Sequence, residues 1–296
     1  MHAMGSWEIL GGWWRIATLA VGLLALAAAI APIKAETYRE RGAYLVTTLG
    51  ACGNCHTPHD AQNRPISGMA LAGGREFDLP IGHVVGPNIT PDKQTGIGAW
   101  SDGQVIYALR NGKRPDGSII GPPMPIEMYR GLSDHDAEAI ATYLRSIAAV
   151  RREVPRSQYK ILLPPGYGPV VGHVEEPDRK DKIAYGAYLA GPVAHCLECH
   201  TPRDKGELAL DRLGAGGREF PDFDNPGAMT VSRDITPTGI GEWSDADVKR
   251  AILVGKRPDG TKLSGVMPFT AYNGMTSDDV NAIVDYLRAL KPATSP

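Results

Sequence analysis

The 296-residue sequence has few phenylalanines, few cysteines and little net charge. Its 31 basic and 33 acidic residues leave a formal charge of −2, which excludes a strongly basic nucleic-acid-binding protein. There are only four phenylalanines, whereas glycine (35) and proline (24) exceed their average usage. Much of the backbone is therefore expected to lie in turns and loops. Either the chain is poorly packed or something other than side chains, such as a large flat apolar cofactor, fills the interior.

A strongly apolar run without charged side chains, residues 16–33, lies between Arg15 and Lys34. A basic residue before an apolar run is typical of a secretory signal peptide, and the small residues after it predict cleavage after Ala35 or Ala31. The run is also just long enough to span a bilayer, so a retained membrane anchor stays open as the alternative. In either case the rest of the chain is predicted to be exported.

The sequence repeats itself at an interval of roughly 143 residues. The matching segments, which keep their order, are 52–58 with 196–202, 72–77 with 215–220, 100–102 with 243–245, 113–117 with 256–260, 124–125 with 267–268 and 143–145 with 286–288. A period this long indicates a duplicated domain and not a solenoid. We predict a leader or anchor at 1–35, domains at 36–150 and 181–296, and a linker at 151–180 whose prolines favour an extended strap.

Helices are the only regular elements that the sequence predicts. No stretch shows a convincing alternation of apolar and polar residues, the pattern of a half-buried strand. Ser101 with Gln104 and Ser133 with Asp136 have the spacing of helix N-caps, and the second copy repeats both arrangements. A closing amphipathic helix is indicated by apolar residues at Ile140, Tyr143, Leu144 and Ile147. The predicted fold class is all-α, with two tandem domains and long loops.

The motif Cys-x-x-Cys-His occurs twice, at residues 52–56 and 196–200, and uses every cysteine in the chain. It is the attachment motif of c-type haem. On a helical turn, side chains at i and i+3 share a face, so both thiols can reach the vinyl groups of one porphyrin. The histidine then points at the iron. The sequence thus predicts two covalently attached haems c, bound by Cys52, Cys55, Cys196 and Cys199, with His56 and His200 as iron ligands.

The same cysteines could in principle serve as a redox pair, as zinc ligands or as structural disulfides. A thioredoxin-like redox pair needs a strand–helix context, which the sequence does not indicate. Four cysteines and two histidines could bind zinc, but structural zinc pairs usually lie far closer in sequence. Structural disulfides occur in exported proteins, although a three-residue spacing rarely serves only to close a loop. Haem attachment is therefore favoured over all three.

The sixth iron ligand is predicted to be methionine. Met124 and Met267 are the only methionines that map onto each other through the repeat, and proline follows each of them. A distal thioether completes octahedral iron and raises its potential. Methionine as a core-filling residue suits the others better, namely Met69, Met128, Met229 and Met275. We therefore expect His/Met ligation at both irons.

Two further repeated pairs are candidates for contact with the haem propionates. Trp100 and Trp243 could donate through the indole N–H, or could serve only as packing residues. Arg75 and Arg218 could supply charge-assisted hydrogen bonds to a propionate, although a surface role is equally compatible with the sequence.

Each half resembles a class I cytochrome c domain, with an opening helix, Cys-x-x-Cys-His, a Met-Pro loop and a closing Tyr-Leu helix. Over about residues 36–292 the chain is similar to the di- and tri-haem cytochrome c subunits that serve bacterial membrane-associated dehydrogenases for alcohols, gluconate and aldehydes. Similar segments of that group stand at residues 88–91, 95–98, 100–101 and 124–125. The chain departs from the three-haem subunits because it has no third attachment motif.

This resemblance implies periplasmic electron transfer from a dehydrogenase, the donor, towards the respiratory chain, with a terminal oxidase or another cytochrome as acceptor. The implied location is the periplasm, either in solution or at the outer face of the inner membrane through residues 16–33. Iron held by His and Met has no open position for a substrate. We therefore expect an electron carrier and not an enzyme.

Two enzymes remain as alternatives. A di-haem peroxidase also carries two attachment motifs, but it needs one iron that can open a coordination position, which the paired methionines argue against. A di-haem thiosulfate-oxidising enzyme uses a cysteine as distal ligand, and here all four cysteines belong to the attachment motifs.

Overall fold

The computed structural model describes residues 35–222, 225 and 227–293. The described residues from Glu36 onwards form one compact unit. The predicted leader or anchor falls, except for Ala35, outside the described residues. Among the residues that are described, no helix combines the length and the apolar character needed to cross a bilayer. The predicted domain boundaries at 150 and 181 stay a prediction; residues 36–150 and 181–296 are called the first and second half below.

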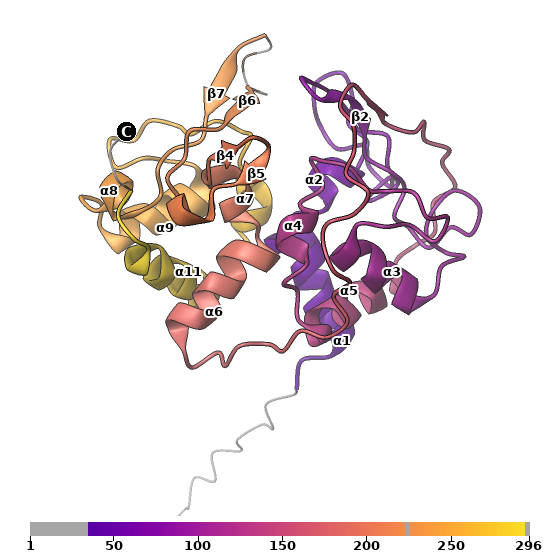
Figure 1. Ribbon diagram of the computed structural model, residues 1–296, viewed down its shortest axis with the longest axis horizontal. Helices are drawn as coiled ribbons and strands as arrows, with labels where there is room; N and C mark the ends of the chain where they lie inside the picture. Colours follow the sequence, from indigo (N-terminus) through magenta and orange to yellow (C-terminus); the bar gives the residue numbers. More distant parts are fainter. Residues whose placement is uncertain (1–34, 223–224, 226, 294–296) are drawn as a thin grey trace, which may run out of the picture. The chain divides into compact units, whose positions relative to one another are not determined.

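Corresponding helices follow one another in the same order in the two halves (Figure 1). The first half contains α1 (Tyr38–Tyr44), the π-helix η1 (Leu45–Leu49), α2 (Gly53–His56), α3 (Asp102–Asn111), α4 (Ile126–Tyr129) and α5 (Asp134–Ser146). The second half contains α6 (Lys182–Tyr188), the π-helix η2 (Leu189–Val193), α7 (Cys196–His200), the 3₁₀ helix η3 (Leu210–Arg212), α8 (Pro237–Ile240), α9 (Asp245–Val254), α10 (Phe269–Tyr272) and α11 (Ser277–Ala289).

The predicted helix starts are confirmed. The Ser101 side chain accepts a hydrogen bond from the Gln104 backbone N–H, and the Gln104 side chain accepts one from the Ser101 N–H, so α3 begins with a complete capping box. Ser133 caps α5 through the Asp136 N–H. α3 ends at Gly112, whose φ of 64° lies in the left-handed region that favours glycine.

The prediction of an all-α fold is wrong, because the described residues also contain short strands in three sheets. These are β1 (Glu76–Leu79), β2 (Gly82–Val85) and β3 (Gln158–Tyr159) in one antiparallel sheet, β4 (Arg203–Asp204) with β5 (Glu207–Leu208), and β6 (Glu219–Pro221) with β7 (Met229–Val231). Strands of two to four residues are too short to show a period-2 pattern. One residue of this sheet does leave a sign in the sequence, namely Gly82. A Cβ there would lie 2.2 Å from the Gln158 carbonyl oxygen, so the close approach of β3 requires glycine at this position.

The opening and closing helices of each half cross at a glycine. α1 contacts α5, and α6 contacts α11. A Cβ on Gly42 would lie 1.9 Å from the Ala139 carbonyl oxygen, and a Cβ on Gly186 would lie 1.9 Å from the Ala282 carbonyl oxygen. The two backbones are therefore closer at these crossings than any other residue type permits.

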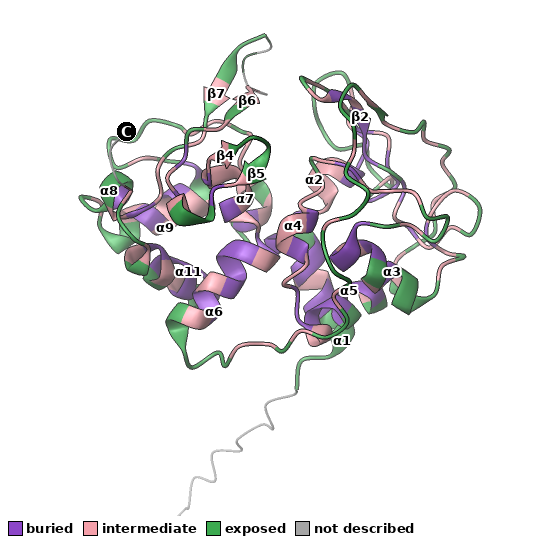
Figure 2. Ribbon diagram, in the orientation of Figure 1, coloured by how far each residue is buried: buried purple, intermediate pink, exposed green. Residues whose placement is uncertain are grey.

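One hydrophobic cluster draws on both halves. Leu45 and Leu49 from η1 and Leu189 and Val193 from η2 are almost fully buried. η1 contacts η2 and α10, and η2 contacts α4. Figure 2 shows buried residues concentrated in the helices, whereas the long loops are largely exposed or intermediate. The two halves thus share a core.

Tyrosine hydroxyls connect the halves in a reciprocal way. The Tyr188 hydroxyl of the second half donates to Asp136 Oδ2 at 2.8 Å and accepts from the Ser133 N–H at 3.1 Å. The Tyr44 hydroxyl of the first half donates to Asp279 Oδ2 at 2.6 Å and accepts from the Thr276 N–H. Each half therefore supplies a hydroxyl to the start of the closing helix of the other.

Tyr188→Phe is expected to lower the free energy of unfolding by about 1–3 kcal/mol, because it leaves the buried Ser133 N–H without a partner. Tyr44→Phe should cost less, because Tyr44 is only partly buried. Denaturant unfolding followed by circular dichroism measures both changes. Tyr107→Phe, on the exposed side of α3, serves as the control and should stay within about 0.5 kcal/mol of wild type. Equal stability of all three variants would contradict the proposed role of these hydroxyls.

Candidate haem-attachment sites

Both Cys-x-x-Cys-His motifs form a single helical turn. The residue before each first cysteine has a positive φ, 45° at Ala51 and 44° at His195. In the first motif the Cys55 and His56 N–H groups both donate to the Cys52 carbonyl, at 3.2 and 2.9 Å. The expected geometry, with both cysteines on one face of a turn, is therefore present.

Each motif histidine is held by a backbone carbonyl. His56 Nδ1 lies 2.8 Å from the Pro87 carbonyl oxygen, and His200 Nδ1 lies 2.7 Å from the Arg233 carbonyl oxygen. A carbonyl can only accept, so Nδ1 carries the proton and the lone pair remains on Nε2. Burial lowers the pKa of both histidines, although the hydrogen bonds act in the opposite direction. Neutral imidazoles with a free Nε2 are what iron ligation requires.

All four cysteines are described, and all four are free and partly buried. Burial, with a smaller contribution from the second cysteine of each motif, raises the pKa of Cys52 and of Cys196 to about 12. In the part of the chain that is described, the one group of three or more His, Cys, Asp or Glu ligand atoms close enough for a metal is at His135, Asp136 and Glu176, and it contains no motif cysteine.

The two candidate distal methionines occupy equivalent turns. Met124 lies two residues before α4 and Met267 two residues before α10, each followed by the proline that caps the helix; both methionines are partly buried against the hydrophobic cluster. The Ile126 N–H donates to the Met124 carbonyl at 2.8 Å, and the Phe269 N–H to the Met267 carbonyl at 2.9 Å. Two free thiols, an imidazole with an open Nε2 and a thioether in each half form a donor set that fits haem c.

Arg75 and Arg218 lie beside the motifs, where they bind the residue that precedes the second cysteine. Arg75 Nη1 donates to the Asn54 carbonyl and to Asn54 Oδ1, the latter at 2.9 Å. Arg218 Nη1 donates to the Glu198 carbonyl and to Glu198 Oε1, the latter at 3.2 Å. Each guanidinium also stacks over a phenylalanine ring of the adjoining strand. Their predicted contact with a propionate stays a prediction; their present contacts fix the strand to the motif.

Trp100 and Trp243 are partly buried and pack against the shared core, as their packing interpretation predicted. The Trp243 carbonyl accepts a hydrogen bond from Arg288 Nη2 at 2.5 Å, and the Trp100 carbonyl accepts one from Arg145 Nη2. The two arginines were visible in the sequence only as members of a repeated Tyr-Leu-Arg segment. The structure shows that they hold the tryptophan turns against the closing helices.

His195 has no histidine counterpart in the first half, where Ala51 precedes the motif, and sequence reasoning therefore gave it no role. Its Nε2 lies 3.3 Å from the Gly50 carbonyl oxygen, just before the first motif, and its ring meets Tyr129 edge-on at 5.9 Å. Because Cys196 follows it directly, His195 joins the two attachment segments. Its position at the end of a helical run next to a motif cysteine was the only available hint.

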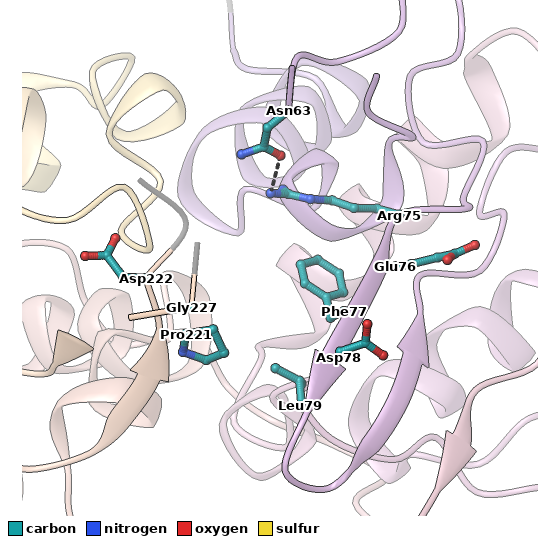
Figure 3. Close-up of a pocket in the computed structure, with 9 residues that line it drawn as sticks. All are labelled: Asn63, Arg75, Glu76, Phe77, Asp78, Leu79, Pro221, Asp222 and Gly227. Atoms are coloured by element: carbon teal, nitrogen blue, oxygen red, sulfur yellow. Dashed lines mark hydrogen bonds between the residues drawn. The ribbon is translucent and has the colours of Figure 1, made fainter. Parts of the chain in front are cut away.

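A cleft of about 330 Å³ lies between β1 and the β6–β7 hairpin (Figure 3). Asn63 and residues 75–79 line it on one side, and Pro221, Asp222 and Gly227 on the other. Arg75 connects the cleft to the first motif, since it also contacts Asn63 Oδ1 at 3.2 Å. The cleft contains none of the predicted haem ligands.

Comparison with known proteins gives consistent matches. The family model "Cytochrome c" matches residues 40–148. The chain is 31% identical, over 94% of its length, to the alcohol dehydrogenase (quinone) cytochrome c subunit of Gluconobacter oxydans, and 30% identical, over 93% of its length, to the gluconate 2-dehydrogenase cytochrome c subunit of Pantoea cypripedii. It spans 60% and 64% of those proteins. It is also 30% identical to a diheme cytochrome c-type protein of Cereibacter sphaeroides, over 81% of each chain.

Proposed function

Because the chain belongs to the cytochrome c family, we propose that it relays electrons through two covalently bound haems c, one on each motif. Electron transfer by haem is the function of this family, and the chain is accordingly an electron carrier and not an enzyme. The observation that carries the two-haem proposal is the repetition of one complete donor set. In both halves the motif histidine is fixed by a carbonyl at Nδ1 and the cysteines are free.

The bound haem supplies a one-electron couple at iron. The chain supplies the rest. His56 and His200 present Nε2 in a fixed orientation, and Met124 and Met267 are the candidates for the opposite face. If these residues held the iron, no coordination position would be left for a substrate, and the side chains would set the potential without acting on a bound molecule. The matches to cytochrome subunits give the peroxidase alternative no support.

The proposed donor is a dehydrogenase, because several of the related proteins are named as cytochrome subunits of dehydrogenases. The proposed acceptor is a terminal oxidase or another cytochrome of the respiratory chain. We place this exchange in the periplasm, because the uncharged run at 16–33 has the character of an export signal or anchor.

The test is intact-mass spectrometry of the denatured protein after expression in a host that matures c-type cytochromes. The expected mass exceeds that of the processed polypeptide by two haems. A mass corresponding to one haem would overturn the relay between two haems within the chain. A bare polypeptide, from a host that matures a control cytochrome, would overturn covalent attachment altogether.

Met124→Ala and Met267→Ala are each expected to remove the weak thioether-to-iron absorption band of one haem and to leave that of the other. The effect is expected at one haem only, because each methionine lies in the same half as the motif whose iron it is expected to bind. Absorption spectra of the oxidised protein measure the band. Met229→Ala is the matched control, since this methionine is half exposed on β7 and has no equivalent in the first half. Unchanged bands in both test variants would contradict the His/Met assignment.

A further inference from the structure

The second half has an open sheet edge where the first half has a covered one. In the first half β2 lies between β1 and β3. In the second half β7 pairs with β6, and no third strand of the described chain pairs with its outer side. The consequence for equivalent side chains is large: Val85 in β2 is 3% exposed, whereas Val231 in β7 is 48% exposed.

At equivalent positions of β7 and β2, the backbone N–H and C=O groups face the same side of the strand. The Gly86 N–H donates to the Arg75 carbonyl at 2.9 Å, and the equivalent Ser232 N–H donates to the Arg218 carbonyl at 2.8 Å. N–H and C=O groups of successive residues in a strand face opposite sides. The backbone groups of the preceding residue, Val85 or Val231, therefore face away from the hairpin partner.

In the first half this outward side is occupied. The Val85 N–H donates to Ser157 Oγ at 3.0 Å, and His83 pairs with Gln158 in β3. In the second half the equivalent outward positions belong to Val231 and Met229, which are half exposed and have no strand partner among the described residues. An edge of this kind is open to pairing with another extended chain.

The two halves share the first part of the path that leads to this edge. After the closing helix of the first half, the Val150 N–H donates to Thr90 Oγ1 at 3.1 Å, and the chain then continues to β3. The Ala293 N–H donates to Thr236 Oγ1 at the same distance, so the second half follows the same path. The described residues of the second half stop at this point. None of them takes the place of β3.

The segment that covers β2, residues 156–159, makes a second contact that the second half lacks. Arg156, just before β3, donates to Asp116 Oδ2 at 2.9 Å, while Asp116 Oδ1 accepts from the Ser118 N–H. In the second half Asp259 Oδ1 accepts in the same way from the Thr261 N–H at 2.9 Å. No described cation occupies the place of Arg156 beside Asp259.

This edge adjoins the second haem-attachment site. β7 runs directly into Ser232 and Arg233, and the Arg233 carbonyl is the group that orients His200. A chain bound along β7 would therefore lie beside the second motif.

We propose that the outer edge of β7 binds an extended segment of the electron-exchange partner by strand addition. The segment has the chemistry of residues 156–159: an arginine that pairs with Asp259, a serine or threonine opposite Val231, and an aromatic residue two positions further along. It covers the exposed side chains of Met229 and Val231. The nature of the partner rests on the proposed function; the binding edge does not.

The test uses a fluorescently labelled peptide with the sequence of residues 153–162, titrated into the full-length protein of established haem content. Saturable binding, read by fluorescence anisotropy, is expected. Val231→Pro removes the outward N–H and should weaken binding about tenfold or more, since one main-chain hydrogen bond and its geometry are lost. Val231→Thr keeps that N–H and should bind within about twofold of wild type. Asp259→Asn, an independent variant on the surface, should weaken binding several-fold and reduce its salt dependence.

Absence of saturable binding, or binding that neither Val231→Pro nor Asp259→Asn weakens, would overturn the proposal. Sedimentation equilibrium without peptide gives a third outcome. A dimer that Val231→Pro dissociates would assign the edge to a second copy of this chain and would also overturn it. Because peptide binding and haem content are measured separately, a protein that binds peptide but carries no covalent haem would refute the proposed function and leave the edge standing.

Discussion

Asp136→Asn should lower the free energy of unfolding by about 3–5 kcal/mol, whereas the equivalent Asp279→Asn should cost only about 1 kcal/mol. Asp136 receives two hydrogen bonds of 2.8 Å from the Arg41 guanidinium, and both side chains are almost fully buried. Asparagine removes the carboxylate that is hydrogen-bonded to the buried Arg41 charge, and only the more weakly coupled Asp279 then opposes that charge. Asp279 instead accepts from the uncharged hydroxyls of Tyr44 and Tyr185, one on each carboxylate oxygen, and the amide oxygen of asparagine can still accept from one of them.

The difference in stability between wild type and Asp136→Asn is expected to decrease as the pH falls. Burial by itself would raise the pKa of Asp136, but the hydrogen bonds and charge of Arg41, with the Tyr188 hydroxyl and His135, bring it below the usual value. A lowered folded-state pKa gives stabilisation that is complete above the unfolded-state pKa of about 4 and is lost as the pH falls through the folded-state value. The gap between wild type and Asp136→Asn should therefore narrow below about pH 4.

Urea unfolding at pH 7 and at several lower pH values measures both effects. Asp136→Asn and Asp279→Asn form a matched pair, because the two aspartates lie at the same position of the closing helices. Each accepts a hydrogen bond from a tyrosine hydroxyl of the other half. Equal costs at pH 7 would show that the Arg41 charge does not depend on Asp136. A gap that widened in acid would contradict the direction of the pKa shift.

Gly42→Ala and Gly186→Ala are expected to destabilise the protein by about 3 kcal/mol each, at the upper end of what overpacking costs. In both cases the added Cβ would meet a backbone carbonyl oxygen at 1.9 Å, and a helix backbone cannot move aside as a flexible side chain can. The two crossing helices of that half would have to separate along their length.

Gly103→Ala is the control for this experiment. Gly103 also lies in a helix, α3, but the nearest atom to an added Cβ is Ser101 Oγ at 3.9 Å. With space available, alanine should stabilise the helix by up to about 1 kcal/mol. Thermal unfolding of the three variants separates the two effects. A Gly42→Ala variant as stable as Gly103→Ala would show that the crossing tolerates more separation than the contact distances imply.

The sequence predicted those features that depend on local spacing. The caps at Ser101 and Ser133 follow from hydrogen bonds over three residues, and the helical turn of each motif follows from the three-residue spacing of its cysteines. These predictions succeed because the residues that interact are near each other along the chain. The assignment of the iron ligands Met124 and Met267 stays a prediction, since it depends on the repeat and not on a contact in the structure.

The features that sequence reasoning missed depend on contacts between distant segments. β3 lies in the linker, which was expected to be only an extended strap, and its pairing with β2 spans residues too far apart for any local pattern. The link from His195 to Gly50 joins the two halves across their shared core. The Tyr44 and Tyr188 contacts could not be predicted for the same reason, because the acceptor of each hydroxyl lies in the other half.

Because of the reciprocal tyrosine contacts, each half depends on the other to satisfy its backbone hydrogen bonds. A chain cut within the linker and separated would leave Ser133 and Thr276 each with a backbone donor that the other half had satisfied. It would also expose the apolar faces of η1 and η2 to water. A single half is therefore not expected to fold by itself, and we expect the two halves to melt together in one calorimetric transition.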